Sequence, residues 1–151
     1  MSVTYPRGFA AAGSTAGLKP SGKPDLSLVH NTGEHDAVAA VYTSNRCRAN
    51  PVLWSQQASA DGRARAVVLN SGGANCYTGS FGFETTHATA ERTAELLGID
   101  PLDVLVCSTG LIGVGGQDFR DRILTGLPAL AEAAQETPAG GAAAAEAIMT
   151  T

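Results

Sequence analysis

Short apolar runs separated by turn residues recur along the chain, and each run is typical of a buried strand. The runs at 26–31 (LSLVHN) and 37–44 (AVAAVYTS) are joined by TGEHD, a turn-rich connection, so the sequence predicts a hairpin here. A third run, 64–75 (ARAVVLNSGGAN), and a fourth, 103–108 (DVLVCS), each end in a glycine-rich segment. Both are predicted to be strands that open into loops.

Predicted helices alternate with these strands, and the second of them, 83–98, has alanines and leucines at helical spacing. The first, 51–62, ends at an Asp-Gly pair, and the second, 83–98, has a glycine where a helix C-cap belongs. In the third, Gly126 and Pro128 favour a break, so one or two helices are expected. The last is an alanine-rich stretch that begins as a low-complexity linker. These predicted helices are 51–62, 83–98, 117–135 and 137–151. The alternation favours an α/β or α+β fold with a mixed sheet.

Composition adds limits on the class of protein. The chain has 151 residues, 44% hydrophobic and 16% charged, which predicts a single globular domain over 1–151. Its net charge of −4 and its 5% of aromatic residues give no reason to expect a nucleic acid or a membrane surface as partner. No apolar run approaches the ~20 residues of a membrane span, and the first residues do not resemble a signal peptide. The expected location is the cytoplasm.

Cysteine and histidine residues are scattered. Three cysteines without a CxxC pair and three histidines without an HExxH or HxxxH pair predict neither a disulfide framework nor a metal site.

The stretch VCSTGLIGVGG (106–116) is the strongest candidate for chemistry. Its glycines do not fit the GxGxxG or GxxxxGK[ST] patterns, which disfavours nucleotide binding. Bare backbone at a strand end can instead donate N–H groups to a developing oxyanion, and the Thr109 hydroxyl beside the Gly110 amide forms such a pair. The alternative is a tight turn between a strand and a helix, and the local sequence leaves both open. No GxSxG elbow supports a serine hydrolase.

Longer segments support a more specific interpretation, because several occur in one order along nearly the whole chain. They are GFAAAGSTAGLKPSGKPDLSLV (8–29), AAVYTSNRCRANPV (39–52), VVLNSGGANCYTG (67–79), VCSTGLIG (106–113) and AIMTT (147–151). Together they resemble the ornithine acetyltransferase family, whose members are also described as bifunctional glutamate N-acetyltransferases.

The resemblance implies a function in arginine biosynthesis. Acetyl would pass from N-acetylornithine to glutamate through an acetyl-threonine, without a cofactor, and acetyl-CoA stays open as an alternative donor. The family's polypeptide cuts itself into α and β chains, and the nucleophilic threonine begins the β chain. The expected partners are that β chain and the two substrates, in an oligomer of α/β heterodimers. The implied fold is a layered sandwich of mixed sheets flanked by helices, in four layers.

Three residues carry over from the family by position. Thr109 and Gly110 match its oxyanion-hole pair, and Thr150 matches a position that contacts the amino-acid substrate. For Thr150 the alternative is a helix-end hydroxyl that bonds local backbone groups. The segment Asn70–Asn75 receives no role from the resemblance.

The sequence also departs from the family, since nothing in it matches the motifs KGSGMI or ATML around the nucleophile. We therefore expect most of an α chain that carries half of an active site and is inactive alone. The alternative is a non-catalytic ligand-binding or structural subunit.

Overall fold

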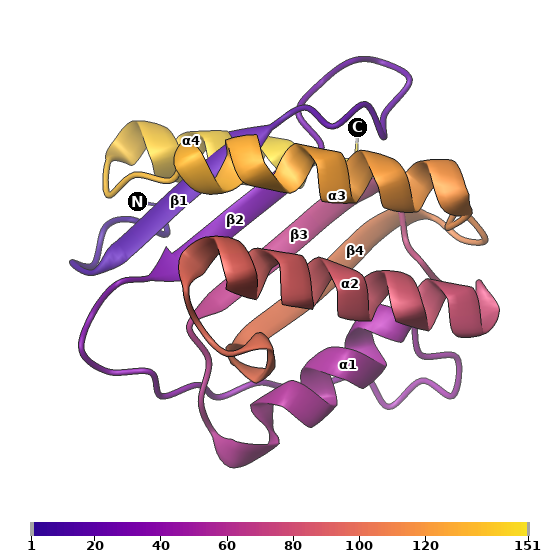
Figure 1. Ribbon diagram of the computed structural model, residues 1–151, viewed down its shortest axis with the longest axis horizontal. Coiled ribbons are helices and arrows are strands. Elements are labelled where there is room, and N and C mark those ends of the chain that lie inside the picture. Colours follow the sequence, from indigo (N-terminus) through magenta and orange to yellow (C-terminus); the bar gives the residue numbers. More distant parts are fainter. Residues whose placement is uncertain (1, 151) are drawn as a thin grey trace.

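A mixed four-stranded sheet forms the centre of the molecule, with its strands side by side in the order β1-β2-β3-β4 (Figure 1). The computed structural model describes residues 2–150. Pairing is antiparallel between β1 and β2 and between β2 and β3, and parallel between β3 and β4. The strands are β1 (Phe9–Ser14), β2 (Leu26–Asn31), β3 (Ala66–Gly73) and β4 (Val104–Leu111).

Helices cover both faces and one edge of this sheet. α2 and α3 cross the face that is in front in Figure 1, and α4 packs on the opposite face beside β1 and β2. α1 runs along the outer edge of β4. Within residues 2–150, no helix is both long and apolar enough to cross a bilayer. The helices are α1 (Asn50–Ala58), α2 (Gly79–Leu97), α3 (Gln117–Glu132) and α4 (Pro138–Ala147), with short 3-10 turns at Ser59–Asp61 and Pro101–Asp103.

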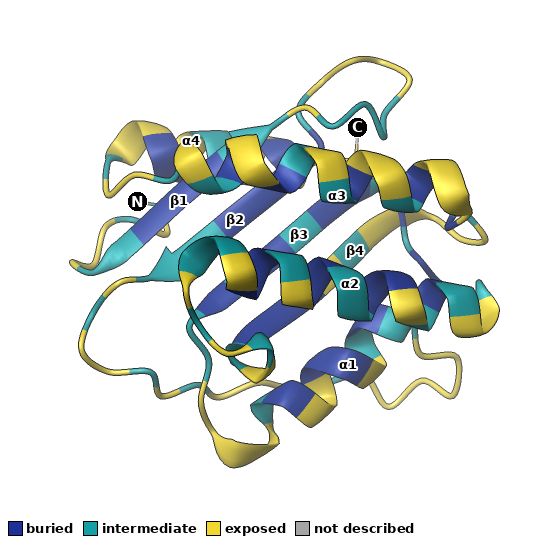
Figure 2. Cartoon of the chain, in the orientation of Figure 1, coloured by how far each residue is buried: buried dark blue, intermediate teal, exposed yellow. Residues whose placement is uncertain are grey.

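The hydrophobic core lies between the sheet and the pair α2 and α3. Alternate strand residues point to this face, because side chains on a strand alternate between its two sides. Figure 2 shows that the inward sides of α2 and α3 are buried as well. The core includes Leu26, Leu28, Val68, Val104 and Val106 from the strands and Phe119, Ile123, Leu127 and Leu130 from α3.

The structure confirms the predicted α/β fold with a mixed sheet flanked by helices. Residues 2–150 form one sheet, so the second sheet of the four-layer sandwich stays a prediction. Most predicted elements also occur: Gly62 and Gly98 adopt left-handed conformations and end their helical segments, as their positions in the sequence indicated.

The predicted hairpin between 26–31 and 37–44 is wrong. Its second half is irregular apart from an isolated bridge between Ala37 and Arg63, and Val41 is 99% exposed. The physical reason is that β1 and β3 already occupy both edges of β2, which leaves no edge for 37–44. β1 itself was not predicted from the sequence.

The predicted break at Gly126 and Pro128 is also absent, because α3 is one continuous helix. Pro128 lies on its exposed side, while Leu127 and Leu130 are buried against the sheet. Burial of these leucines on both sides of the proline favours continuation of the helix over the break.

Candidate active site

Two glycines lie side by side where β3 and β4 end. Gly72 and Gly110 are register partners, and their φ angles are +107° and +127°. A Cβ atom on Gly110 would lie 2.7 Å from the Gly72 carbonyl carbon, and one on Gly72 would lie 2.9 Å from the Leu18 carbonyl oxygen. Both positions therefore require glycine, for conformation and for space.

Thr109 and Gly110 lie within a strand, which corrects the sequence-based prediction of a loop from residue 109. β4 continues to Leu111 because the parallel pairing with β3 extends through the glycines. The Ala74 N–H then donates to the Leu111 carbonyl at 2.9 Å. The glycine-rich sequence gave no sign of this pairing, because its partner is the equally glycine-rich end of β3.

The outer edge of β4 is covered by α1 over its first half only. Ser55 Oγ donates to the Val106 carbonyl at 2.8 Å and accepts from the Val106 N–H at 2.9 Å. Trp54 Nε1 donates to the Val104 carbonyl at 2.9 Å. Because backbone groups alternate between the two edges of a strand, the Gly110 N–H points to the same outer edge. No residue outside the sheet accepts it within the part of the chain that the structure describes.

Thr109 is exposed, and its side chain lies on the sheet face that carries α4. Its register partner, Ser71, is buried, and Ser71 Oγ donates to the Ala147 carbonyl at 2.5 Å. This bond holds the last turn of α4 against the end of β3. Thr150 follows three residues later and is exposed. The segments that carry the three predicted site residues therefore meet at the same end of the sheet.

A buried carboxylate, Asp25, orders the loop beside Gly72. Its oxygens accept from the backbone N–H groups of Ala16, Leu18 and Lys19 at 2.6, 2.6 and 3.0 Å. The Leu18 carbonyl that contacts Gly72 is thereby fixed. The sequence analysis missed Asp25, whose one local sign was a carboxylate between a proline and an apolar strand.

The segment Asn70–Asn75, which had no predicted role, contributes two buried side-chain amides. Asn70 accepts from Ser108 Oγ at 2.5 Å and donates to the Gly73 carbonyl at 2.9 Å. Asn75, at φ +46°, donates to the Gly82 carbonyl at 2.8 Å and so joins this segment to the first turn of α2.

The other potential nucleophiles near Thr109 are poorly activated. Desolvation raises the pKa of the Cys107 thiol, although part of its surface is exposed, which keeps it protonated near neutral pH. The Ser108 hydroxyl is engaged by Asn70. His87 packs against Trp54 and Phe83 on the other side of the molecule's core, with ring centroids 4.3 and 5.0 Å away. Within residues 2–150, no histidine side chain bonds a hydroxyl or thiol, and no three potential ligands gather around a metal position.

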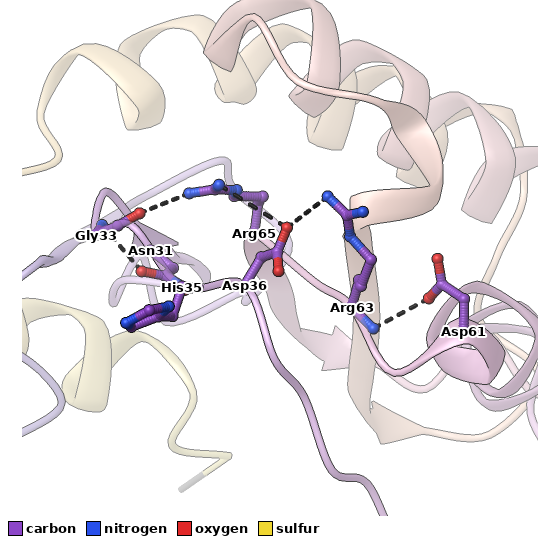
Figure 3. Close-up of polar contacts among 7 residues, drawn as sticks. All are labelled: Asn31, Gly33, His35, Asp36, Asp61, Arg63 and Arg65. Atoms are coloured by element: carbon purple, nitrogen blue, oxygen red, sulfur yellow. Dashed lines mark hydrogen bonds and ion pairs between the residues drawn. The ribbon is translucent and has the colours of Figure 1, made fainter.

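The opposite end of the sheet carries a polar cluster of structural character (Figure 3). The Asp36 carboxylate oxygen Oδ2 lies 2.6 Å from Arg63 Nη2 and 3.9 Å from Arg65 Nη2. Arg65 Nη1 also donates to the Gly33 carbonyl at 2.7 Å. These contacts fix the loop that follows β2. Because β3 begins here and ends at Gly73, the cluster is distant from the paired glycines.

An apolar groove lies on the sheet face that α4 only partly covers. Its volume is about 1100 Å³, and it is bounded by the sheet, α4 and the first residues of the chain. Its lining includes Val29, Val67, Leu69, Ala144 and Ile148.

Comparisons with known proteins show what the chain as a whole is similar to. The ArgJ family model matches residues 10–151. The arginine biosynthesis bifunctional protein ArgJ of Streptomyces coelicolor is 56% identical over 151 residues, which are all of this chain and 38% of that protein. The chain thus spans about 38% of the length of the curated relatives it matches.

Two solved structures share the fold. The ornithine acetyltransferase of Mycobacterium tuberculosis, crystallised with ornithine, superimposes with a TM-score of 0.96 at 49% identity, over 99% of this chain and 79% of that one. The ArgJ protein of Bacillus halodurans gives a TM-score of 0.92 at 34% identity, over 100% of this chain and 76% of that one. With a family match over almost its whole length and a sheet that superimposes on two of the family's structures, the chain belongs to the ArgJ family.

Proposed function

We propose that this chain forms part of an enzyme of arginine biosynthesis that transfers acetyl from N-acetylornithine to glutamate. Two relatives support the choice of reaction: the S. coelicolor protein is named for bifunctional action in arginine biosynthesis, and the M. tuberculosis enzyme is an ornithine acetyltransferase bound to ornithine. The observation that carries the proposal is the Gly110 N–H, which points to the open part of the β4 edge beside the exposed Thr109 hydroxyl.

Acetyl transfer requires a site of this kind at two steps. A threonine hydroxyl attacks the acetyl carbonyl of N-acetylornithine, negative charge collects on the carbonyl oxygen, and the ornithine amine leaves with a proton. The glutamate amine then attacks the acetyl-threonine ester, and the threonine oxygen leaves and recovers its proton. In our proposal the Gly110 N–H and the Thr109 O–H donate to the carbonyl oxygen in both tetrahedral intermediates. The glycine pair and its packing preorganise these donors.

Thr150 is proposed to contact the amino-acid part of the substrate. The support is the bond between Ser71 and the Ala147 carbonyl, which holds the end of α4 against the strand position paired with Thr109. An exposed hydroxyl three residues after this bond can reach a ligand bound at the end of the sheet.

The nucleophile is proposed to come from a second chain, as the family resemblance implies. The length comparison supports two chains: these residues make up 79% of the crystallised M. tuberculosis chain but 38% of the S. coelicolor relative, so the crystallised chain is about half as long as that relative. An α-amine next to the nucleophilic hydroxyl would act as its base. No cofactor is needed, because the donor is itself an acetylated amino acid. The oligomer of α/β heterodimers and the cytoplasmic location remain predictions.

The test is an assay of the complete enzyme with N-acetylornithine and glutamate. We expect ornithine and N-acetylglutamate to appear in equal amounts, and a second reaction with acetyl-CoA and glutamate measures whether that donor is also accepted. If acetyl does not pass between the two amino acids, the proposed function is wrong.

A further inference from the structure

We propose that Asn70 is a positioning residue for the oxyanion hole, which it serves through the backbone of β3 rather than by contact with substrate. The inference rests on the proposed function and assigns to the NSGGAN segment a task that no motif explained.

The contacts of Asn70 join three parts of the two central strands. Its side chain is 4% exposed and lies opposite Ser108, its register partner on β4. Ser108 Oγ donates to Asn70 Oδ1 at 2.5 Å, and Asn70 Nδ2 donates to the Gly73 carbonyl at 2.9 Å. One amide therefore joins β4 immediately before Thr109 to β3 immediately after Gly72.

The second bond holds the peptide that directly follows the one supporting Gly110. The Cα atom of Gly110 packs so closely on the peptide between Gly72 and Gly73 that a Cβ atom would lie 2.7 Å from both the Gly72 carbonyl carbon and the Gly73 nitrogen. The Gly73 carbonyl belongs to the next peptide, between Gly73 and Ala74. By holding it, the amide of Asn70 limits rotation of Gly72 and Gly73, which have no side chains to restrain them. The position of Gly110, and with it the direction of its N–H, then depends on Asn70.

The bond from Ser108 to Asn70 restrains β4, the strand that carries Gly110. Ser108 is two residues before Gly110, and its hydroxyl is held by a buried acceptor. Oxyanion donors act by being in place before charge develops, and a displacement of about 1 Å can cost on the order of 10²-fold in rate. Loss of either bond should therefore lower the rate of chemistry more than the binding of substrate.

The experiment compares Asn70→Ala, Ser108→Ala and the double variant in the complete enzyme, with kcat referred to the amount of acetyl-enzyme that each preparation forms. We expect Asn70→Ala to lower kcat by roughly 10- to 100-fold, with the KM for N-acetylornithine changed by less than about twofold. Ser108→Ala should have a smaller effect, and the double variant should be no slower than Asn70→Ala, because both changes remove the same support. Ser108→Thr keeps the hydroxyl and should recover most of the rate.

Thr93→Val is the matched control. Thr93 is also buried, and its hydroxyl donates only to the Thr89 carbonyl within α2, so this change should lower the melting temperature and leave kcat unaltered. An Asn70→Ala enzyme with normal kcat per acetylated site, or a Thr93→Val enzyme slowed as much as Asn70→Ala, would overturn the inference. If Asn70→Ala does not fold, the kcat values of Ser108→Ala and Ser108→Thr test the inference instead. A lower kcat in Ser108→Ala that Ser108→Thr largely recovers supports it, and equal kcat values in the two variants overturn it. A wild-type enzyme without acetyl transfer would instead refute the proposed function.

Discussion

Some residues at the ends of β3 and β4 have backbone conformations that few other residue types could adopt. Gly110 combines a φ of +127° with a contact that leaves no space for a Cβ atom, whereas Gly113, at φ +86°, has open space around it. Gly110→Ala should therefore destabilise the protein by more than the roughly 1–3 kcal/mol of backbone strain, and Gly113→Ala by the strain alone. Urea denaturation of both variants measures the difference. Equal losses would mean that the packing of Gly110 on Gly72 has no energetic weight.

Thr109 presents the contrasting case of an exposed residue whose importance would be chemical. Thr109→Ala should lower turnover of the complete enzyme by roughly 10²- to 10³-fold, as expected for the loss of one oxyanion donor. Because the side chain is exposed, the melting temperature should stay the same. Thr109→Ser retains the hydroxyl and should keep most of the activity. Unchanged turnover in the alanine variant would remove Thr109 from the site.

His30 gives the stability of the protein a dependence on pH. Burial, and then the charge of Arg65, lower the pKa of this histidine from its ordinary value of 6.5. The folded state thus favours neutral His30, so its contribution to stability is complete above about pH 6.5 and is lost as the pH falls below that value. His30→Gln should reduce the loss of stability between about pH 7.5 and pH 5, as read from urea midpoints. A wild-type pH profile unaltered by His30→Gln would contradict this assignment.

At the scale of elements, α1 protects the first half of β4, which would otherwise be an open strand edge. The Ser55 hydroxyl bonds both the N–H and the carbonyl of Val106 in a buried setting. Ser55→Ala should therefore cost about 1–3 kcal/mol, because it leaves two buried backbone groups without partners. The control is Gln57→Ala on the same helix, which should cost less because Gln57 is exposed. A thermal melt that does not separate the two variants would show that the edge is not held by Ser55.

The elements also show what the sequence could predict. Helix ends at Gly62 and Gly98 and the strands around Val68 and Val106 follow from local patterns, and they occur as predicted. β1 could not be recognised, because its alanines and glycine are weak strand formers. On the face that carries α4 a small residue is required, because a Cβ atom on Gly13 would lie 2.1 Å from the Ala143 carbonyl oxygen.

The candidate site divides in the same way. The residues proposed to act on substrate, Thr109, Gly110 and Thr150, were predicted from the family resemblance, with a local motif as further support for the first two. The bonds around them were not, since Asp25 contacts a loop, Ser71 contacts α4 and Asn70 contacts β4. Each of these polar residues is buried by tertiary structure and satisfied by a partner that no local spacing indicates.

At the scale of the whole molecule, the two faces of the sheet differ in their cover. α2 and α3 enclose one face completely enough to form the core, whereas the face with α4 keeps an open apolar groove along Val29, Val67 and Leu69. Leu111, the last residue of β4, and Ile112, which follows it, are both exposed. Apolar surface of this extent is typical of an interface. In the proposed two-chain enzyme, the second chain would cover it.

Residues 1–151 on their own should therefore differ from the complete enzyme in two measurable ways. They should transfer no acetyl, because oxyanion donors without an attacking group can only stabilise an intermediate that never forms. They should also bind a hydrophobic dye such as ANS and self-associate in sedimentation velocity, because the groove faces water. Production together with the second chain should abolish dye binding and restore turnover. Acetyl transfer by the purified 151-residue chain would contradict this prediction and would place the nucleophile among its own residues.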